Sequence, residues 1–286
     1  MFASTYTVHI SEAAAYQKDV YILTGYRKSM TAYGDAYDSL LYMHNETVNI
    51  WSHIFGFLLF TSLLPVTMLQ LDNATEQLIF LSYIIPCIEL FGASACYHLF
   101  KYQSERSAEL WQKLDHLSVI FLLWGSDMPM ICYGFWSFPT LQMIYVVTVT
   151  MMIVCVAFII KSDEMQLPHL FVLRNTIFVG TCAVGWMQLI HEMSLKGWSS
   201  SSALQALACW AKAFGTYLLG FAFFVSRIPE VLIPIKFDLI GASHQIWHVV
   251  IVIAAMIQLN NCWVYRSIAL NTTDILNLHN GSLSIK

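Results

Sequence analysis

The sequence has few charged residues. Asp, Glu, Lys and Arg make up 11% of the 286 residues, whereas an ordinary soluble domain carries about 25%. Hydrophobic residues make up 57%. This shortage of charge excludes an ordinary soluble domain and indicates an integral membrane protein. The net charge of −4 argues against a nucleic-acid partner, which would favour a basic surface.

Several local signals are also absent. The seven cysteines form no Cys-x-x-Cys pair, and all except Cys262 fall within apolar runs, so we expect no disulfide framework. The first twenty residues contain no apolar core of signal-peptide length, so we expect no cleaved leader. The last residues, GSLSIK, do not form an ER-retrieval signal of the KDEL type.

Seven apolar runs are long enough to cross a bilayer, for which an α-helix needs about 20 residues. They cover roughly residues 48–70, 77–100, 115–137, 139–160, 171–193, 203–226 and 243–262. The sequence therefore predicts an all-α integral membrane protein, a seven-helix bundle over residues 48–262. We expect a cytosolic tail at 1–47 and a lumenal or extracellular tail at 263–286.

The distribution of basic residues predicts the orientation, because Lys and Arg accumulate on the cytosolic side. With a cytosolic N-terminus, ten of the 14 basic residues fall on that side, three fall on the other, and Lys212 lies within a span. Glycosylation sequons at Asn73, Asn271 and Asn280 then fall on the non-cytosolic side. The sequon at Asn45 falls in the cytosol, where we expect it to stay unmodified.

Three predicted helices bring polar side chains to their cytosolic ends. The second ends with Ser94 and His98, the third begins with Asp115, and the seventh begins with His244 and His248. Residues four apart share one helix face, and such residues within membranes usually face the protein interior. Three imidazoles from two helices can hold Zn²⁺, leaving one position open for water. Asp115 would then accept the proton of that water.

Each of these residues also has a simpler interpretation. The two histidines of the last span could face lipid headgroups. Asp115 could cap the N-terminus of the third helix. The Ser94 hydroxyl could donate a hydrogen bond to the carbonyl group of Leu90 in its own helix.

Other polar residues lie near or within the spans. Asn49, Ser52 and His53 follow the start of the first span, where we expect them to support the histidine cluster by packing. Lys212 and two acids, Glu89 and Asp127, lie at membrane depth, where a lone charge is costly. We expect a buried pair between Lys212 and one of the acids. The stretch YQSERSAELWQK (102–113) is mixed in charge and predicts a solvated connector, with a binding loop as the alternative.

These motifs resemble those of the progestin and adipoQ receptor family. The stretches HNETVNIWSH (44–53), Ser94-x-x-x-His98, Leu114-Asp115 and SHQIWH (243–248) occur in the family's order, preceded by ILTGYR (22–27). The resemblance extends from about Asp19 to about Asn260. It implies a seven-helix bundle with a cytosolic N-terminus and Zn²⁺ held by His98, His244 and His248. It also implies that Asp115 and Ser94 lie beside the water, and that His53 is not a ligand.

The resemblance implies more than one class of function. NETVNIWSH (45–53), YHLF (97–100) and GASHQIWH (241–248) look closest to the Golgi member that traps Raf kinase and damps MAP kinase signalling. We therefore expect a scaffold in the Golgi membrane, with a cytosolic Raf-like kinase as partner. The alternatives are a receptor like the adiponectin receptors, with the plasma membrane as the alternative location, and a zinc hydrolase of the ceramidase kind. In the hydrolase, Asp115 and Ser94 would be catalytic and a sphingolipid would be the substrate. All three would contact membrane lipids.

Overall fold

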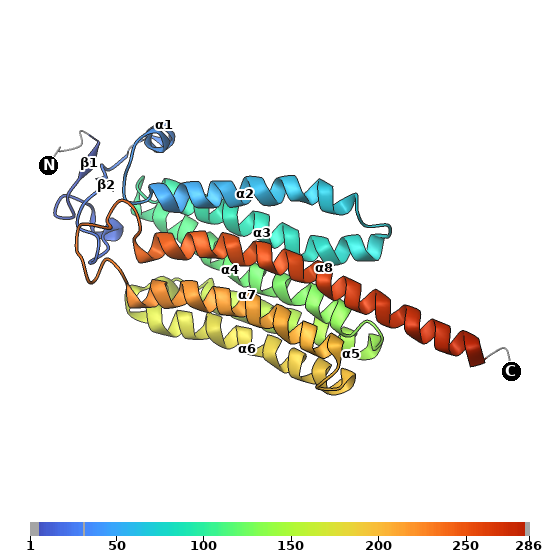
Figure 1. The fold of residues 1–286 in the computed structure, drawn as a ribbon. Helices are drawn as coiled ribbons and strands as arrows, with labels where there is room; N and C mark the ends of the chain where they lie inside the picture. Colours follow the sequence, from blue (N-terminus) through green and yellow to red (C-terminus); the bar gives the residue numbers. More distant parts are fainter. Residues whose placement is uncertain (1–5, 31, 284–286) are drawn as a thin grey trace. The chain divides into compact units, whose positions relative to one another are not determined.

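The computed structural model describes residues 6–30 and 32–283, with side chains up to residue 271. Within these residues, seven helices are long and apolar enough to cross a membrane, as the sequence predicts (Figure 1). They are α2 (Thr47–Met68), α3 (Ala74–Phe100), α4 (Glu105–Gly134), α5 (Pro139–Ile160), α6 (Phe171–Lys196), α7 (Ser201–Ser226) and α8 (Ser243–Leu283). The sequon at Asn280 and the last two residues of the Asn271 sequon lie outside the described side chains.

Short elements occupy the segment before α2. Strands β1 (Thr7–Val8) and β2 (Tyr26–Arg27) pair antiparallel, with Thr7 opposite Arg27. Helix α1 (Tyr33–Asp38) follows, between 3-10 turns at Ala15–Gln17 and Ser39–Leu41. Two further 3-10 turns, Glu164–Gln166 and Pro168–Leu170, join α5 to α6.

The start of the third long helix differs from the prediction. Helix α4 begins at Glu105 and not near residue 115, so most of the expected connector 102–113 is helical. Ser104 caps this helix, because its hydroxyl oxygen accepts a hydrogen bond from the Ser107 N–H at 3.1 Å. The first turns are polar and therefore carry no apolar run, although they are helical. Most of the predicted connector is therefore a helix, and the alternative interpretation of Asp115 as a helix cap is wrong.

The chain forms two compact units. The first comprises the chain up to Ser62, Cys87–Val119 and Phe214–Ala254, and the second comprises Leu63–Pro86, Ile120–Ala213 and the chain from Ala255. In the first unit, Figure 1 shows the segment before α2 at the end where α2 and α8 begin. A buried hydrophobic cluster joins this segment to α3, with Tyr26 and Met30 packed among Leu99, Phe100 and Tyr102.

Arg27 fastens the N-terminal segment to the end of α3. Its side chain is fully buried, and its guanidinium donates hydrogen bonds to the carbonyl oxygens of His98 at 2.5 Å and Leu99 at 3.1 Å. The last carbonyl groups of a helix have no partner within the helix and carry partial negative charge. The same guanidinium lies 4.3 Å from the ring centre of Tyr102. Arg27 therefore caps α3 at the level of His98.

Helices α2 and α3 approach closely through two glycines in the first unit. A Cβ added at Gly56 would lie 2.8 Å from the Phe91 ring, and one added at Gly92 would lie 3.3 Å from the Phe57 ring. Each glycine therefore receives an aromatic ring of the other helix. Small residues at helix contacts are typical of membrane proteins, where close packing replaces the hydrophobic effect as the force between helices.

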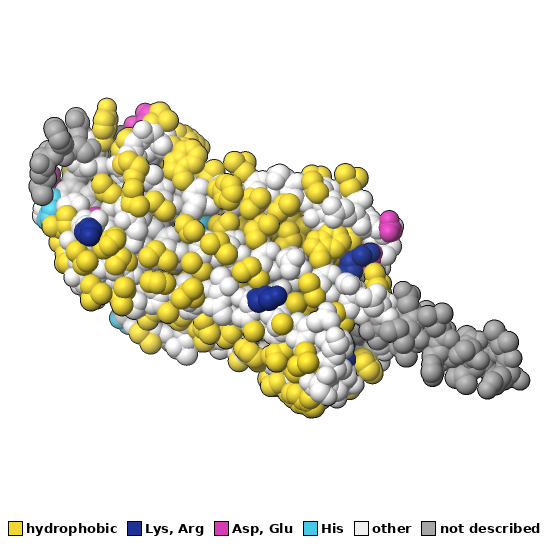
Figure 2. Space-filling view, viewed as in Figure 1, with side chains coloured by type: hydrophobic (Ala, Val, Ile, Leu, Met, Phe, Trp, Pro, Cys, Tyr) yellow, Lys and Arg dark blue, Asp and Glu magenta, His cyan; other side chains and the backbone are white. Residues whose placement is uncertain are grey.

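The long helices expose apolar side chains. Within the second unit, α5 exposes Met143, Ile144, Val147, Met151 and Phe158 along its length. Figure 2 shows hydrophobic side chains across the visible face of the helices, with few charged groups among them. Such a surface would promote aggregation in water but suits the hydrocarbon of a bilayer.

Replacement of Arg27 should weaken the fold at the end of α3. We expect Arg27→Met to cost about 2–4 kcal/mol of stability, because two buried carbonyl groups lose charged hydrogen-bond donors. The thermal unfolding midpoint of the purified protein should fall by at least about 5 °C. The exposed Lys18→Met is the matched control and should change the midpoint little. Equal midpoints in the two variants would show that Arg27 does not hold this end of the helix.

Candidate metal centre

The three predicted ligands lie at helix ends within the first unit. His98 stands two residues before the end of α3, and His244 and His248 occupy the first two turns of α8. The start of α8 is fixed by Glu230, whose carboxylate accepts a hydrogen bond from the Ser243 N–H at 2.7 Å and another from the Ser243 hydroxyl. The four-residue spacing then stacks the two histidines on one face.

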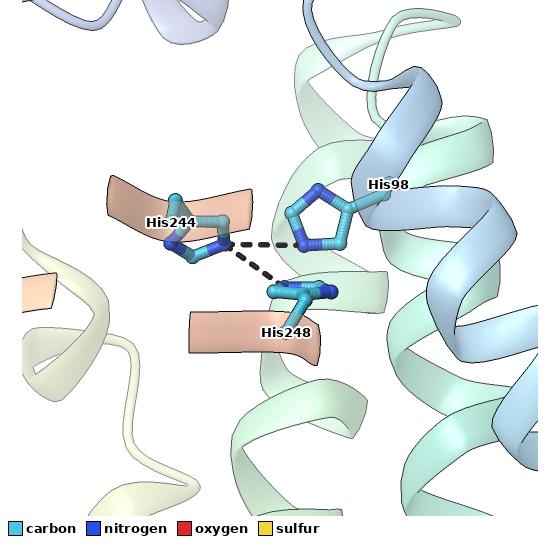
Figure 3. Close-up of side chains that lie close together, drawn as sticks. All are labelled: His98, His244 and His248. Carbon is cyan, nitrogen blue, oxygen red and sulfur yellow. Dashed lines mark hydrogen bonds between the residues drawn. The ribbon is translucent and has the colours of Figure 1, made fainter. Parts of the chain in front are cut away.

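The Nε2 atoms of the three histidines converge (Figure 3). His244 Nε2 lies 3.4 Å from His98 Nε2 and 3.1 Å from His248 Nε2. The ligating atoms of the three rings all lie within 4.8 Å of one another. His98 and His248 are buried, whereas His244 is partly exposed. The structure thus brings the three residues together as a group that could hold a metal ion.

The opposite ring nitrogens of two histidines are held by acceptors. His98 Nδ1 lies 2.7 Å from the Glu46 carboxylate, and His248 Nδ1 lies 3.3 Å from the backbone oxygen of Asn49. Neither acceptor carries a proton, so each Nδ1 must be the donor. The Nε2 atoms of neutral His98 and His248 therefore carry lone pairs that point toward the same place. A metal ion satisfies both lone pairs, whereas a single proton on His244 can satisfy only one.

Glu46 is buried and fully engaged. Besides His98, its carboxylate accepts hydrogen bonds from Lys101 Nζ at 2.8 Å and Asn49 Nδ2 at 2.6 Å. Burial alone would raise the pKa of Glu46, but the charge of Lys101 and the hydrogen bonds from Lys101 and His98 outweigh burial and hold this pKa well below 4.5. Burial alone would lower the pKa of Lys101, but the charge of Glu46 outweighs burial and raises the pKa of Lys101. Glu46 is thus ionised at neutral pH. A carboxylate is the usual partner that orients a metal-binding histidine.

The spacing of the nitrogens fits zinc. Two nitrogens bound to one tetrahedral Zn²⁺ at about 2.0–2.1 Å lie about 3.3 Å apart. The two closest Nε2 separations, 3.1 and 3.4 Å, bracket this value. Imidazole nitrogens are also a preferred donor set for zinc. Three ligands would leave a fourth position open.

Ser94 and Asp115 form a second pair beside this group. The Asp115 carboxylate accepts a hydrogen bond from the Ser94 hydroxyl, which is buried. Ser94 lies one helical turn before His98, on the same face of α3. Asp115 lies ten residues inside α4 and is partly buried, so it does not cap the helix. Ser94 and Asp115 therefore join α3 to α4. These are the two residues that the sequence predicts beside a metal-bound water.

The polar residues at the start of α2 have distinct positions. Asn49 contacts both His248 and Glu46, as expected for a supporting residue. The ring of His53 stacks on that of His248, with centroids 3.9 Å apart, and His53 is not in the group of three possible ligands. His53 thus fixes the plane of a predicted ligand.

Sequence reasoning missed the residues that hold the ligands in place. The sequence predicts no role at this site for Glu46, Arg27 or Lys101. One signal for Glu46 was available, because a carboxylate stood immediately before the polar start of an apolar span, within the motif HNETVNIWSH. No local pattern indicates that its partner is 52 residues away in His98.

The chain is similar to a known protein family and to several known proteins. The family model described as "Haemolysin-III related" matches residues 41–259. The adiponectin receptor protein of Drosophila melanogaster is 29% identical over 84% of this chain, and progestin and adipoQ receptor family member 3 of Mus musculus is 31% identical over 82%. The ADIPOR-like receptor IZH2 of Saccharomyces cerevisiae is 32% identical over 87%.

The relatives also differ in length. The matches cover 55% of the Drosophila protein, 77% of the mouse protein and 80% of the yeast protein. The three identities lie within a few per cent of one another, so overall similarity does not single out one of these relatives. The names confirm the predicted resemblance to the progestin and adipoQ receptor family.

Removal of the Glu46 carboxylate should weaken metal binding without removing a ligand. We expect Glu46→Gln to reduce Zn²⁺ affinity about 10–100-fold, because the His98 ring loses its charged hydrogen-bond acceptor. Competition with a fluorescent chelator measures the affinity. Glu109→Gln, which changes an exposed carboxylate of α4, is the matched control and should bind as the unmodified protein does. Equal affinities for all three proteins would contradict the role of Glu46.

Proposed function

The chain belongs to the haemolysin-III-related family of membrane proteins, and we propose that it is a receptor-like protein built around a Zn²⁺ ion held by His98, His244 and His248. One observation carries this proposal. The Nε2 atoms converge at separations suited to one tetrahedral ion, while the opposite nitrogens of His98 and His248 are engaged by Glu46 and Asn49. Buried hydrogen bonds thus orient the lone pairs of His98 and His248 toward one place.

The geometry best supports hydrolysis of an amide bond. His98, His244 and His248 would hold a Zn²⁺ ion, which would act as a Lewis acid and would lower the pKa of bound water to about 7. Structural zinc sites more often have four protein ligands. Asp115 would take the proton of the attacking water, and Ser94 would hold the Asp115 carboxylate in position. The carbon–nitrogen bond of the substrate would break, and the leaving nitrogen would take the proton back from Asp115.

The substrate class follows from the surroundings. Ser94, His98 and Asp115 all lie on membrane-spanning helices, so a substrate would enter from the lipid phase. Of the three histidines, His244 is the partly exposed one and marks the accessible side of the group. We propose the amide of a sphingolipid such as ceramide, the substrate class that the family resemblance implies.

A scaffold that traps a Raf-like kinase is the second candidate. The observation that favours it is the apolar surface of the segment before α2, where Val20, Tyr33, Tyr37 and Leu41 are exposed. Apolar side chains that are exposed outside the hydrocarbon layer suit a protein partner. In this alternative, zinc would stabilise the bundle, and the protein would damp MAP kinase signalling from the Golgi membrane. A receptor like the adiponectin receptors, in the plasma membrane, would use the same surface.

We propose that the N-terminus is cytosolic and that residues 263–286 face the lumen or the cell exterior. The distribution of Lys and Arg supports this orientation. The environments of two sequons agree with it. Asn73 is exposed, whereas Asn45 is buried and accepts a hydrogen bond from the Tyr102 hydroxyl at 3.2 Å. A glycan on Asn45 would be incompatible with this fold.

Metal content tests the zinc site directly. We expect about one zinc per chain in the purified protein and almost none in the His244→Ala/His248→Ala double variant, because a single imidazole cannot retain the ion. Elemental mass spectrometry measures the content, and circular dichroism checks that each protein is folded. His169→Ala, which removes an exposed histidine, should retain zinc. Folded protein that contains no zinc, even after incubation with Zn²⁺, would refute the site.

Asp115→Asn separates the two candidate functions. The variant should keep its zinc but lose ceramide hydrolysis by about 10²–10⁴-fold, because Asn cannot accept the proton. Kinase recruitment, measured by co-purification with a Raf kinase domain, should be unaffected. Hydrolysis at the unmodified rate would eliminate Asp115 as the base. Absence of hydrolysis in the zinc-loaded unmodified protein, together with recruitment, would leave the scaffold.

A further inference from the structure

A second group of buried polar side chains lies in the second unit, between α4, α6 and α8. Its two carboxylates are Asp127, 9% exposed, and Glu192, 3% exposed. Glu192 is paired, because it accepts hydrogen bonds from Lys196 Nζ at 2.7 Å and the Tyr265 hydroxyl at 3.3 Å. Among the residues that the structure describes, Asp127 makes no hydrogen bond or ion pair through its carboxylate. The predicted buried pair of Lys212 with Glu89 or Asp127 does not form among the described residues, and Lys212 and Glu89 are both exposed.

Helices α4 and α6 run parallel in matching register along this group. A Cβ added at Gly185 would lie 3.1 Å from Asp127 Oδ1, and one added at Gly134 would lie 2.9 Å from Glu192 Oε2. Positions 127 and 134 of α4 thus face positions 185 and 192 of α6, with seven residues between the two levels on each helix. Seven residues rise about 10 Å. The two glycines let the carboxylates lie against the neighbouring backbone.

Helix α8 follows the same register. Gln258 Nε2 donates a hydrogen bond to the Ser126 carbonyl at 2.9 Å, at the level of Asp127, and Tyr265 contacts Glu192 seven residues later. The three helices therefore enclose a polar column that begins near Asp127 and ends at Glu192.

Two amide side chains between these levels contain atoms without hydrogen-bond partners. Gln188 precedes Glu192 by one turn on α6, and Asn261 precedes Tyr265 by one turn on α8. Both side chains are at least 97% buried. Among the described residues, neither amide atom of Gln188 has a hydrogen-bond partner, and neither does Oδ1 of Asn261. Buried polar groups are nearly always satisfied in folded proteins, so these atoms face a small polar species.

We propose that this column binds a monovalent cation, Na⁺, in the interior of the second unit. Asp127 supplies a carboxylate that makes no ion pair among the described residues, and the amide oxygens of Gln188 and Asn261 supply neutral ligands. Oxygen ligands suit hard cations, and a single unpaired negative charge suits Na⁺ better than a divalent ion. The cation removes the cost of an isolated charge within a membrane span. This site shares no residue with the candidate zinc site and does not depend on the proposed function.

Thermal unfolding in Na⁺ tests the proposal. The full chain, purified in detergent, is unfolded in NaCl or in choline chloride at equal ionic strength. Because an ion that binds only the folded protein stabilises it, 150 mM Na⁺ should raise the midpoint by about 3 °C or more and the rise should saturate. Asp127→Asn keeps the side-chain shape and should abolish the rise. The exposed Asp38→Asn is the matched control and should retain it.

A second variant keeps the test decisive if Asp127→Asn fails to fold. Gln188→Met preserves the length of the side chain, removes the unpaired amide and should weaken the Na⁺ response several-fold. Binding of ²²Na⁺ to the unmodified protein should show one saturable site per chain. Equal midpoints in Na⁺ and choline, or an unchanged Na⁺ response in both variants, would overturn the proposal and leave water as the species that satisfies the amides.

Discussion

The candidate metal centre depends on one buried carboxylate. Glu46 binds His98, Lys101 and Asn49 at once, so it joins the start of α2 to the end of α3 and fixes a predicted ligand. A buried carboxylate is costly unless its oxygens are hydrogen-bonded and its charge is paired, and here both conditions hold. The orientation of the His98 lone pair follows from this contact, and the contact of Asn49 with His248 directs a second lone pair to the same place.

Much of the architecture could be predicted because membranes impose simple rules. A span must be long, apolar and helical, so the sequence indicates seven helices from composition alone. Polar residues inside such spans are rare, and His98, His244 and His248 therefore stood out. The four-residue spacing of His244 and His248 places these two on one helix face. The predicted orientation of the spans places His98 on the same side of the membrane. The structure brings these three residues together for the same physical reason, since few other places can accommodate their polarity.

The remaining features arise from contacts between distant parts of the chain. Helix α4 starts ten residues early because Ser104 caps a polar turn that hydropathy does not detect. Glu46 meets His98, and Arg27 meets the carbonyl group of His98, only after α2 and α3 have packed. The predicted pair of Lys212 with Glu89 or Asp127 is wrong because Lys212, although it lies within an apolar run of the sequence, is exposed on α7. Sequence patterns thus predict whether a residue lies within an apolar span. They do not predict which distant residue it contacts.

His98 is held twice by the chain that precedes the membrane core, through its ring by Glu46 and through its backbone oxygen by Arg27. Two sites that share such a contact are thermodynamically linked, and linkage is reciprocal. A protein partner that binds the N-terminal segment and shifts Arg27 would therefore change the affinity of the proposed site for Zn²⁺, and Zn²⁺ would change the affinity for that partner by the same factor. Through Arg27, the availability of zinc would influence which proteins bind the N-terminal segment.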